Sequence, residues 1–157
     1  MKHHLSRSIP SMTLVLGLML SSVGAQAQDE KKTKEGTVYS VGMVRTGANT
    51  EQDYLNELAG YWMPMMESAK TQGLILSYRV LSGAFSNEDD YNVLFLVEYP
   101  NLAALDPSPA TEAKWKAIRD GLNAKMGGPD KMKAMRTGLE AIRTYQGEKL
   151  MREVLVK

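Results

Sequence analysis

The chain has 157 residues and a formal net charge of +1, and it contains no cysteine and only two histidines, His3 and His4. A nearly neutral chain gives no electrostatic reason to expect nucleic acid or an anionic membrane surface as a partner. Because both histidines precede a predicted cleavage site, the mature chain lacks imidazole and thiol groups. This excludes histidine- or cysteine-based nucleophiles and argues against a metal site.

The first 27 residues have the features of a secretory signal peptide. They begin with basic residues and continue with an apolar run, residues 12–23. That run is too short to span a bilayer core, which needs about 20 residues. Ala25-Gln26-Ala27 matches the small-x-small pattern of a cleavage site, so the mature chain should begin at Gln28, with 17 basic and 18 acidic residues. We expect an exported protein, periplasmic or secreted, without a membrane partner after cleavage; the alternative is an uncleaved anchor.

The mature chain is expected to consist of a leader and one domain. Residues 28–36 (QDEKKTKEG) contain no apolar side chain and should form a disordered leader. Residues 37–156 have a length that suits a single domain. Since no disulfide can form, a hydrophobic core has to stabilise this domain.

The domain should begin with a strand and an amphipathic helix. Residues 37–45 (TVYSVGMVR) are rich in β-branched and aromatic residues, which favours a strand. Thr50 is a candidate N-cap with an acidic residue three positions on, and apolar residues then recur at helical steps until Gly73. Pro64 lies inside this helix, so we expect a kink near Tyr61-Trp62.

Two strands follow, residues 74–82 and 91–99, and the turn-forming composition of residues 83–90 predicts an antiparallel hairpin between them. The second strand is apolar on both faces, because Leu94 and Leu96 oppose its aromatic and valine residues. Both faces of this strand therefore need cover.

The last part of the chain is predicted to contain two helices and a strand. Residues 101–106 suit a single helical turn, and the apolar stripe of residues 115–126 stops at Gly127-Gly128. A further helix should run from Pro129 to Gly147, before a final strand at residues 149–156. The predicted order is β-α-β-β-α-α-β.

This order resembles the dimeric α+β barrel superfamily, whose fold is ferredoxin-like, β-α-β-β-α(α)-β. Tyr61-Trp62-Met63-Pro64-Met65-Met66, followed by Gly73 and the apolar residues 74–78, is similar to the helix-to-strand signature of small exported uncharacterised members. Residues 147–153 are similar to the turn into their last strand. The resemblance covers residues 37–156 and implies an α+β domain with a four-stranded antiparallel sheet, covered by helices on one face and by a second subunit on the other.

The resemblance therefore implies a homodimer through the open sheet face. In a monomer that face would be exposed to water, and the exposure of its apolar residues would then have no explanation. We expect these residues to be Leu76, Val80, Leu94 and Leu96. Haem chemistry in this superfamily commonly depends on a histidine, so its absence argues against haem, and we expect no cofactor.

Several polar residues next to apolar surface are candidates for a site. Glu98, Tyr78 and Arg79 are weak catalytic candidates, because a buried carboxylate has the raised pKa that a general base needs. Ligand-binding candidates are Tyr39, Tyr61 and Trp62. For each of these the alternative is a structural role, with tyrosine rings in the core and Glu98 solvated at its strand end.

The methionines of the two helical regions suit core packing, with a Cu(I) site as the alternative. For function two classes stay open. The first is a dimeric domain that binds a small apolar molecule or another partner. The second is a cofactor-independent enzyme, monooxygenase- or isomerase-like, that acts on an apolar aromatic compound.

Overall fold

The computed structural model describes residues 32–157, apart from residues 86 and 88. The predicted signal peptide and residues 28–31 of the predicted leader lie outside the described residues. In chain order the elements are β1 (Thr33–Thr46), α1 (Glu51–Gly60), α2 (Trp62–Thr71), β2 (Ser77–Ser82), β3 (Val93–Tyr99), the 3-10 helix η1 (Leu102–Leu105), α3 (Pro109–Lys125), α4 (Pro129–Ala141) and β4 (Arg143–Val156).

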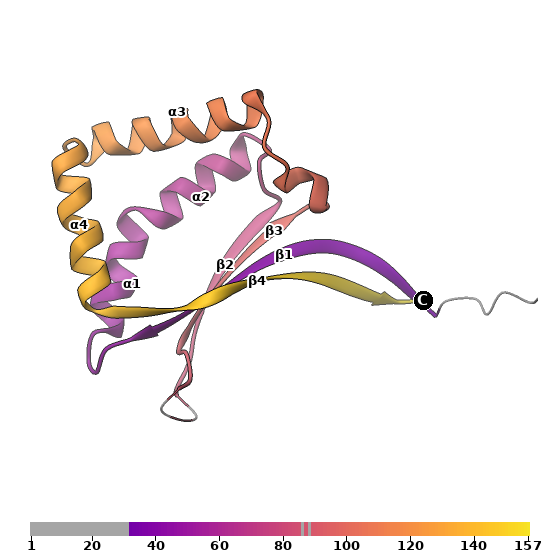
Figure 1. Cartoon of the computed structure of the whole chain (residues 1–157), viewed down its shortest axis with the longest axis horizontal. Helices are drawn as coiled ribbons and strands as arrows, with labels where there is room; N and C mark the ends of the chain where they lie inside the picture. The colour runs from indigo at the N-terminus through magenta and orange to yellow at the C-terminus, as the bar shows by residue number, and fades with distance from the viewer. Residues whose placement is uncertain (1–31, 86, 88) are drawn as a thin grey trace, which may run out of the picture. The chain divides into compact units, whose positions relative to one another are not determined.

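The four strands form one antiparallel sheet in the order β2-β3-β1-β4. The helices lie on one side of this sheet, and the other side is open (Figure 1). A β-α-β-β-α-β chain with this strand order has the ferredoxin-like arrangement. The predicted α+β fold with a four-stranded antiparallel sheet is therefore confirmed, and within one chain the sheet is not closed.

Strand β1 is one of the two inner strands of the sheet. Its buried positions alternate: Val38, Ser40, Gly42, Val44 and Thr46. Successive side chains of a strand point to opposite faces, so these five residues face the helices. Tyr39, Val41 and Met43 lie between them on the open face and are half-buried.

Both long strands extend further than the sequence predicts. Strand β1 begins at Thr33, so the expectation that residues 33–36 belong to a disordered leader is wrong. Thr33 and Glu35 pair with Val156 and Val154 at the end of β4. Backbone hydrogen bonds to this partner strand order a segment whose own side chains have no apolar surface to bury.

Strand β4 begins at Arg143, whereas the prediction placed a helix up to Gly147. Helix α4 ends at Ala141 instead, and residues 143–148 pair with β1. Gly147 has a φ of 133°, and a register shift lies beside it, between the pairs of Met43 and Val44. A glycine adopts this backbone conformation without a side-chain clash, so it suits the irregularity in this strand.

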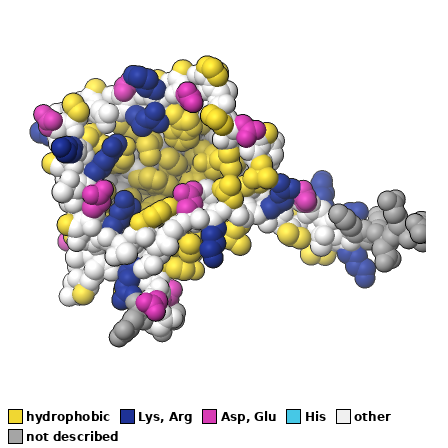
Figure 2. Space-filling model, viewed as in Figure 1, with side chains coloured by type: hydrophobic (Ala, Val, Ile, Leu, Met, Phe, Trp, Pro, Cys, Tyr) yellow, Lys and Arg dark blue, Asp and Glu magenta, His cyan; other side chains and the backbone are white. Residues whose placement is uncertain are grey.

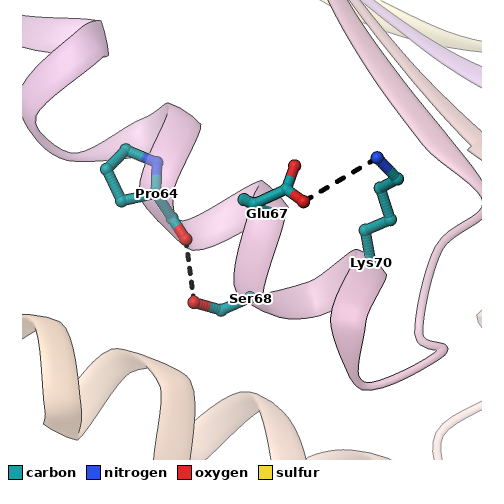
Figure 3. Close-up of polar contacts among 4 residues, drawn as sticks. All are labelled: Pro64, Glu67, Ser68 and Lys70. Carbon is teal, nitrogen blue, oxygen red and sulfur yellow. Dashed lines mark hydrogen bonds and ion pairs between the residues drawn. The ribbon is translucent and has the colours of Figure 1, made fainter.

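The predicted kink is confirmed as a break between α1 and α2 at Tyr61, whose φ and ψ are −126° and −60°. Pro64 has no N–H to donate to the carbonyl of Gly60, which removes one hydrogen bond at this point. One turn later the Ser68 hydroxyl donates to the Pro64 carbonyl at 2.9 Å, and Lys70 lies 3.7 Å from Glu67 (Figure 3). The break turns Trp62 toward the sheet, where it packs in the core.

The start of α1 differs from the prediction. Thr50 holds the N-cap position, but its hydroxyl accepts no hydrogen bond from the first turn. It donates to the carbonyls of Gly47 at 3.0 Å and Ile142 at 3.1 Å. The hydroxyl thus ties the β1–α1 loop to the end of α4, and the predicted capping box with Asp53 does not form.

The remaining elements agree with the prediction, except that β2 begins at Ser77 rather than at residue 74 and β3 begins at Val93 rather than at residue 91. Helix α3 begins with Pro109 after the N-cap Ser108, whose hydroxyl oxygen accepts from the Thr111 amide at 3.1 Å. It ends before Gly127 and Gly128, both at positive φ, as predicted. The predicted hairpin of β2 and β3 is also present. Among the described residues, no helix has the length and apolar character that a membrane crossing requires.

The core consists of two apolar clusters between helices and sheet, and Trp62 packs against both. One contains Met66, Ala69, Ile75, Val97, Ile118 and Leu122. The other contains Val44, Tyr54, Leu58, Val93 and Leu139. Met66 and Met132 are buried, as the core-packing interpretation of the methionines expects.

The open face carries the alternate residues of all four strands. Strand register places there Leu81 of β2, Leu94 and Leu96 of β3, Val41 and Met43 of β1 and Met151 of β4. Val80 was predicted on this face, and that prediction is wrong. Val80 pairs with Phe95 and packs against the helix-side cluster. It directly precedes Leu81 in the strand, so its side chain points to the opposite face.

Candidate ligand pocket

A pocket of about 230 Å³ lies between the helix side of the sheet and the α1–α2 segment. Figure 2 shows a hollow of hydrophobic side chains between β4 and the helices, with charged side chains on its rim. The pocket is lined by Ser40, Gly42, Tyr54, Leu58, Trp62, Met66, Phe95, Val97, Tyr99, Arg143, Tyr145 and Glu148. One wall is therefore apolar and aromatic, and the other is polar.

Trp62 forms the centre of the aromatic wall. Its ring meets Phe95 edge-on with the ring centroids 4.9 Å apart, and it meets Tyr78 in the same way at 5.6 Å. Tyr54 also contacts Phe95 edge-on, with the ring centroids 6.3 Å apart. Edge-to-face pairs of this kind contribute about 0.5–1.5 kcal/mol each beyond their buried area, so these contacts stabilise the positions of the rings.

Gly42 leaves room at the floor of the pocket. A Cβ atom built on Gly42 would lie 3.6 Å from Phe95 and 3.8 Å from the Tyr145 hydroxyl, which are ordinary contact distances. The backbone of β1 therefore does not require glycine here. A glycine inside a strand often marks a place where another group approaches the backbone closely.

The polar wall is built around Glu148 of β4, which is the cross-strand partner of Gly42. The Ser40 hydroxyl donates to one carboxylate oxygen, and the Tyr145 hydroxyl donates to the other at 3.1 Å. A carboxylate offers about four acceptor sites, so these two bonds orient Glu148 and still leave acceptor capacity.

Two tyrosine hydroxyls around Glu148 are held in the protonated form. Burial raises the pKa of Tyr99, and the negative charge of Glu148 raises it further. Burial and Glu148 also raise the pKa of Tyr145. Both hydroxyls are therefore hydrogen-bond donors throughout the neutral pH range.

Arg143 stands at the other end of the polar wall. It donates from Nη1 to the Tyr54 hydroxyl at 3.0 Å, and its guanidinium lies 5.7 Å from the centroid of the Tyr54 ring. Burial raises the pKa of Tyr54, which is fully buried, and Arg143 partly opposes this shift. The contact fixes the cation against the base of α1.

The structure brings one of the predicted site residues into this pocket, namely Trp62. Tyr78 packs behind Trp62 and does not line the pocket. Burial raises the Tyr78 pKa, as does nearby Glu67. Tyr61 lines a separate pocket of about 190 Å³ against α4, where Arg136 donates to its hydroxyl at 3.2 Å.

The other predicted residues, Glu98, Arg79 and Tyr39, lie together on the open face. Glu98 pairs with Tyr39 of β1 and with Ser77 of β2. Its carboxylate accepts from Ser77 at 2.5 Å and from Thr37 at 2.9 Å. The Ser77 hydrogen bond lowers the Glu98 pKa against the opposing effect of burial, with smaller contributions from Thr37, Tyr39 and Arg79. Glu98 therefore lacks the raised pKa that the base hypothesis requires.

Sequence reasoning missed the polar wall. Arg143 and Tyr145 belong to a segment that was predicted as the end of a helix, and Glu148 was assigned to the turn before the last strand, so none of the three was placed on a sheet face. The available signal was in β1, whose buried side carries the small residues Ser40 and Gly42 between Val38 and Val44. Among the described residues, no group of three or more acidic or histidine side chains gathers as a metal site would require.

No family model and no curated protein matches the sequence. One similar solved structure is the crystal structure of a dimeric ferredoxin-like protein from an uncultured marine organism. It is 17% identical, the similarity covers 79% of this chain and 90% of that chain, and the TM-score is 0.43.

Proposed function

We propose that this protein is an exported, homodimeric domain that binds a small apolar molecule in the pocket between the sheet and α1–α2. The single observation that carries the proposal is an aromatic wall facing a polar wall across the space that Gly42 leaves open. Small-molecule sites typically combine an apolar lining with a few placed polar groups.

The size of the pocket limits the ligand. An apolar cavity of about 150 Å³ holds benzene, so a pocket of about 230 Å³ suits one ring with a short substituent. Trp62 and Phe95 present ring surfaces to such a ligand. This agrees with an apolar aromatic compound and is too small for a fused polycyclic one.

The open face of the sheet supports the homodimer. Leu81 is 48% exposed and Met151 is 55% exposed, next to half-buried leucine and valine residues of β1 and β3. A solvated sheet face normally carries polar residues, whereas Val41, Met43, Leu94 and Leu96 form an apolar patch on this one beside Arg79 and Glu98. A second copy, related by a two-fold axis, would cover the same patch on both subunits.

The ends of β1 and β4 give a second argument for a partner copy. Each of these strands has 14 residues, whereas β2 has six and β3 has seven, so a two-stranded ribbon extends beyond the sheet (Figure 1). Val154 is 64% exposed and Val156 is 84% exposed at its end. An isolated two-stranded ribbon is marginally stable in water, so contact with a second subunit would stabilise it.

Export rests on the signal-peptide features of residues 1–27. An oxidising compartment agrees with the absence of cysteine, since no thiol is available for unwanted oxidation.

The ligand-binding part can be tested by NMR titration of the mature chain with toluene and p-cresol. We expect shifts at the Gly42 amide and the Trp62 indole N–H, and we expect Gly42→Val to abolish them by filling the floor. Gly83→Val is the matched control, because a side chain at Gly83 meets nothing within 4 Å. Absence of shifts at millimolar probe, or equal shifts in Gly42→Val, would reject the proposal.

A second candidate function, a cofactor-independent enzyme for the same class of compound, is favoured by Glu148 and Tyr145. A carboxylate beside a protonated hydroxyl is the combination that general base and acid catalysis uses. Native mass spectrometry of protein purified from its host compartment distinguishes the two functions. A binding protein retains one unchanged compound, whereas an enzyme converts that compound after its release and re-addition.

A further inference from the structure

We propose that the ligand of this pocket is a monocyclic arylalkylamine, whose ring packs on Trp62 and Phe95 and whose ammonium group donates to Glu148. This inference rests on the proposed binding function and adds the chemistry of the ligand's polar end. It derives from the way the polar wall is built.

Two hydroxyl groups hold the carboxylate of Glu148 in one orientation. Ser40 is 8% exposed, so its hydroxyl is fixed in the buried side of the sheet and holds one carboxylate oxygen from below. Tyr145, three residues earlier on β4, donates to the other oxygen. Two donors therefore fix the carboxylate, and the remaining lone pairs are free for a donor in the pocket.

The β1 residue opposite Glu148 leaves space for a ligand. Gly42 faces Glu148 across the β1–β4 pair, so no side chain of β1 fills the space in front of the carboxylate. Phe95 and Tyr145 border that space. A ring above Gly42 would therefore lie against aromatic surface with its substituent directed at Glu148.

The charge that Glu148 presents to the pocket is negative, which favours a cationic ligand group. Both Glu148 and Arg143 line the pocket. Arg143 is bonded to the Tyr54 hydroxyl, and Glu148 is bonded to the hydroxyls of Ser40 and Tyr145, so the carboxylate is not paired with the guanidinium in any of these hydrogen bonds. Aromatic faces next to a carboxylate are a typical environment for a bound ammonium group.

The test compares four probes that share one ring: benzylamine, benzyl alcohol, toluene and benzoate. We expect benzylamine to bind the mature protein on the order of tenfold more tightly than toluene, because a charge-assisted hydrogen bond is stronger than a neutral one. Benzyl alcohol should fall between them, and benzoate should bind most weakly. Affinities come from the NMR shifts of the Gly42 amide and the Trp62 indole.

Glu148→Gln should remove the advantage of benzylamine over toluene, and circular dichroism checks that the variant is folded. Glu57→Gln on the exposed side of α1 is the control for the same change in charge, and it should behave as the wild type does. Equal affinities for all four probes, or tightest binding of benzoate, would overturn the inference while the pocket remains a binding site. If no probe shifts the pocket resonances, the proposed binding function fails as well.

Discussion

Gly42 and Glu148 are partners across the β1–β4 pair, one without a side chain and one with its carboxylate held by two hydroxyls. The glycine leaves space in the pocket, and the carboxylate supplies a negative charge at the edge of that space. Because φ at Gly42 is not positive and a Cβ there meets only ordinary contacts, the fold itself does not require glycine at this position.

Gly42→Ala should therefore increase stability while it weakens binding. Alanine removes the extra conformational freedom of glycine from the unfolded chain, which is worth about 0.4–1 kcal/mol where the native backbone suits it. We expect the free energy of unfolding in urea to rise by roughly this amount, while the affinity for toluene falls. A destabilised Gly42→Ala variant would show that glycine is kept for folding.

The buried Tyr54 hydroxyl should contribute to stability through Arg143. Tyr54→Phe removes the hydroxyl that accepts the hydrogen bond from Nη1 of Arg143, so the guanidinium loses this partner. Hydrogen bonds to charged groups contribute about 1.5–3 kcal/mol, so a loss near the lower end of this range is expected for a partly exposed arginine. Urea denaturation measures this loss, and Tyr91→Phe at an exposed position should cost almost nothing. Equal costs would contradict the assigned role.

Glu98 should stabilise the fold at neutral pH and lose this effect in acid. Its pKa in the folded protein is lowered, chiefly by the Ser77 hydrogen bond, from an ordinary value of 4.5. A lowered pKa means that the stabilisation is complete above the unfolded-state pKa and disappears as the pH falls through the folded-state value. The difference in unfolding free energy between the wild type and Glu98→Gln should therefore shrink below about pH 4.5. A difference that stays constant from pH 7 to the acid region would be the contrary result.

The fold was largely predictable, and the site was not, for one physical reason. Strands such as 91–99 and the helical stripe of 115–126 carry their own apolar periodicity, which local sequence reveals. Residues 143–148 are polar and adopt β structure because β1 supplies a partner for their backbone hydrogen bonds. A tertiary partner is invisible in a local pattern, and the polar wall of the pocket comes from this segment.

The position in the sheet also explains why Glu98, the predicted site residue, lies outside the pocket, whereas Glu148 lines it. Glu98 stands in a clear strand and was singled out, yet the register turns it to the open face. Glu148 stands in a segment without a strand pattern and reaches the pocket. A shift of one residue in register moves a side chain to the opposite face, so an error in the strand start changes the whole candidate site.

Signal cleavage can be checked directly in a secreting host. The mature protein should have the intact mass of residues 28–157, because Ala25-Gln26-Ala27 provides the small residues that the peptidase requires. Replacing Ala27 with arginine should stop this cleavage and retain the longer chain at the membrane. A wild-type chain that keeps residues 1–27 would instead support the uncleaved anchor.

Leu96→Glu should convert the proposed dimer into a monomer that remains folded. Leu96 lies on the open face of central strand β3, opposite Val41 on one side and Arg79 on the other. In a monomer a glutamate there is solvated and has Arg79 beside it, whereas in a dimer through this face it would be buried without water, at a cost of several kcal/mol. Light scattering after size exclusion measures the mass, and circular dichroism checks the fold. Leu102→Glu is the matched control, since Leu102 is 47% exposed in η1, outside the sheet. A wild-type chain that is monomeric at micromolar concentration, or a Leu96→Glu variant that stays dimeric, would show that the open face is not the interface.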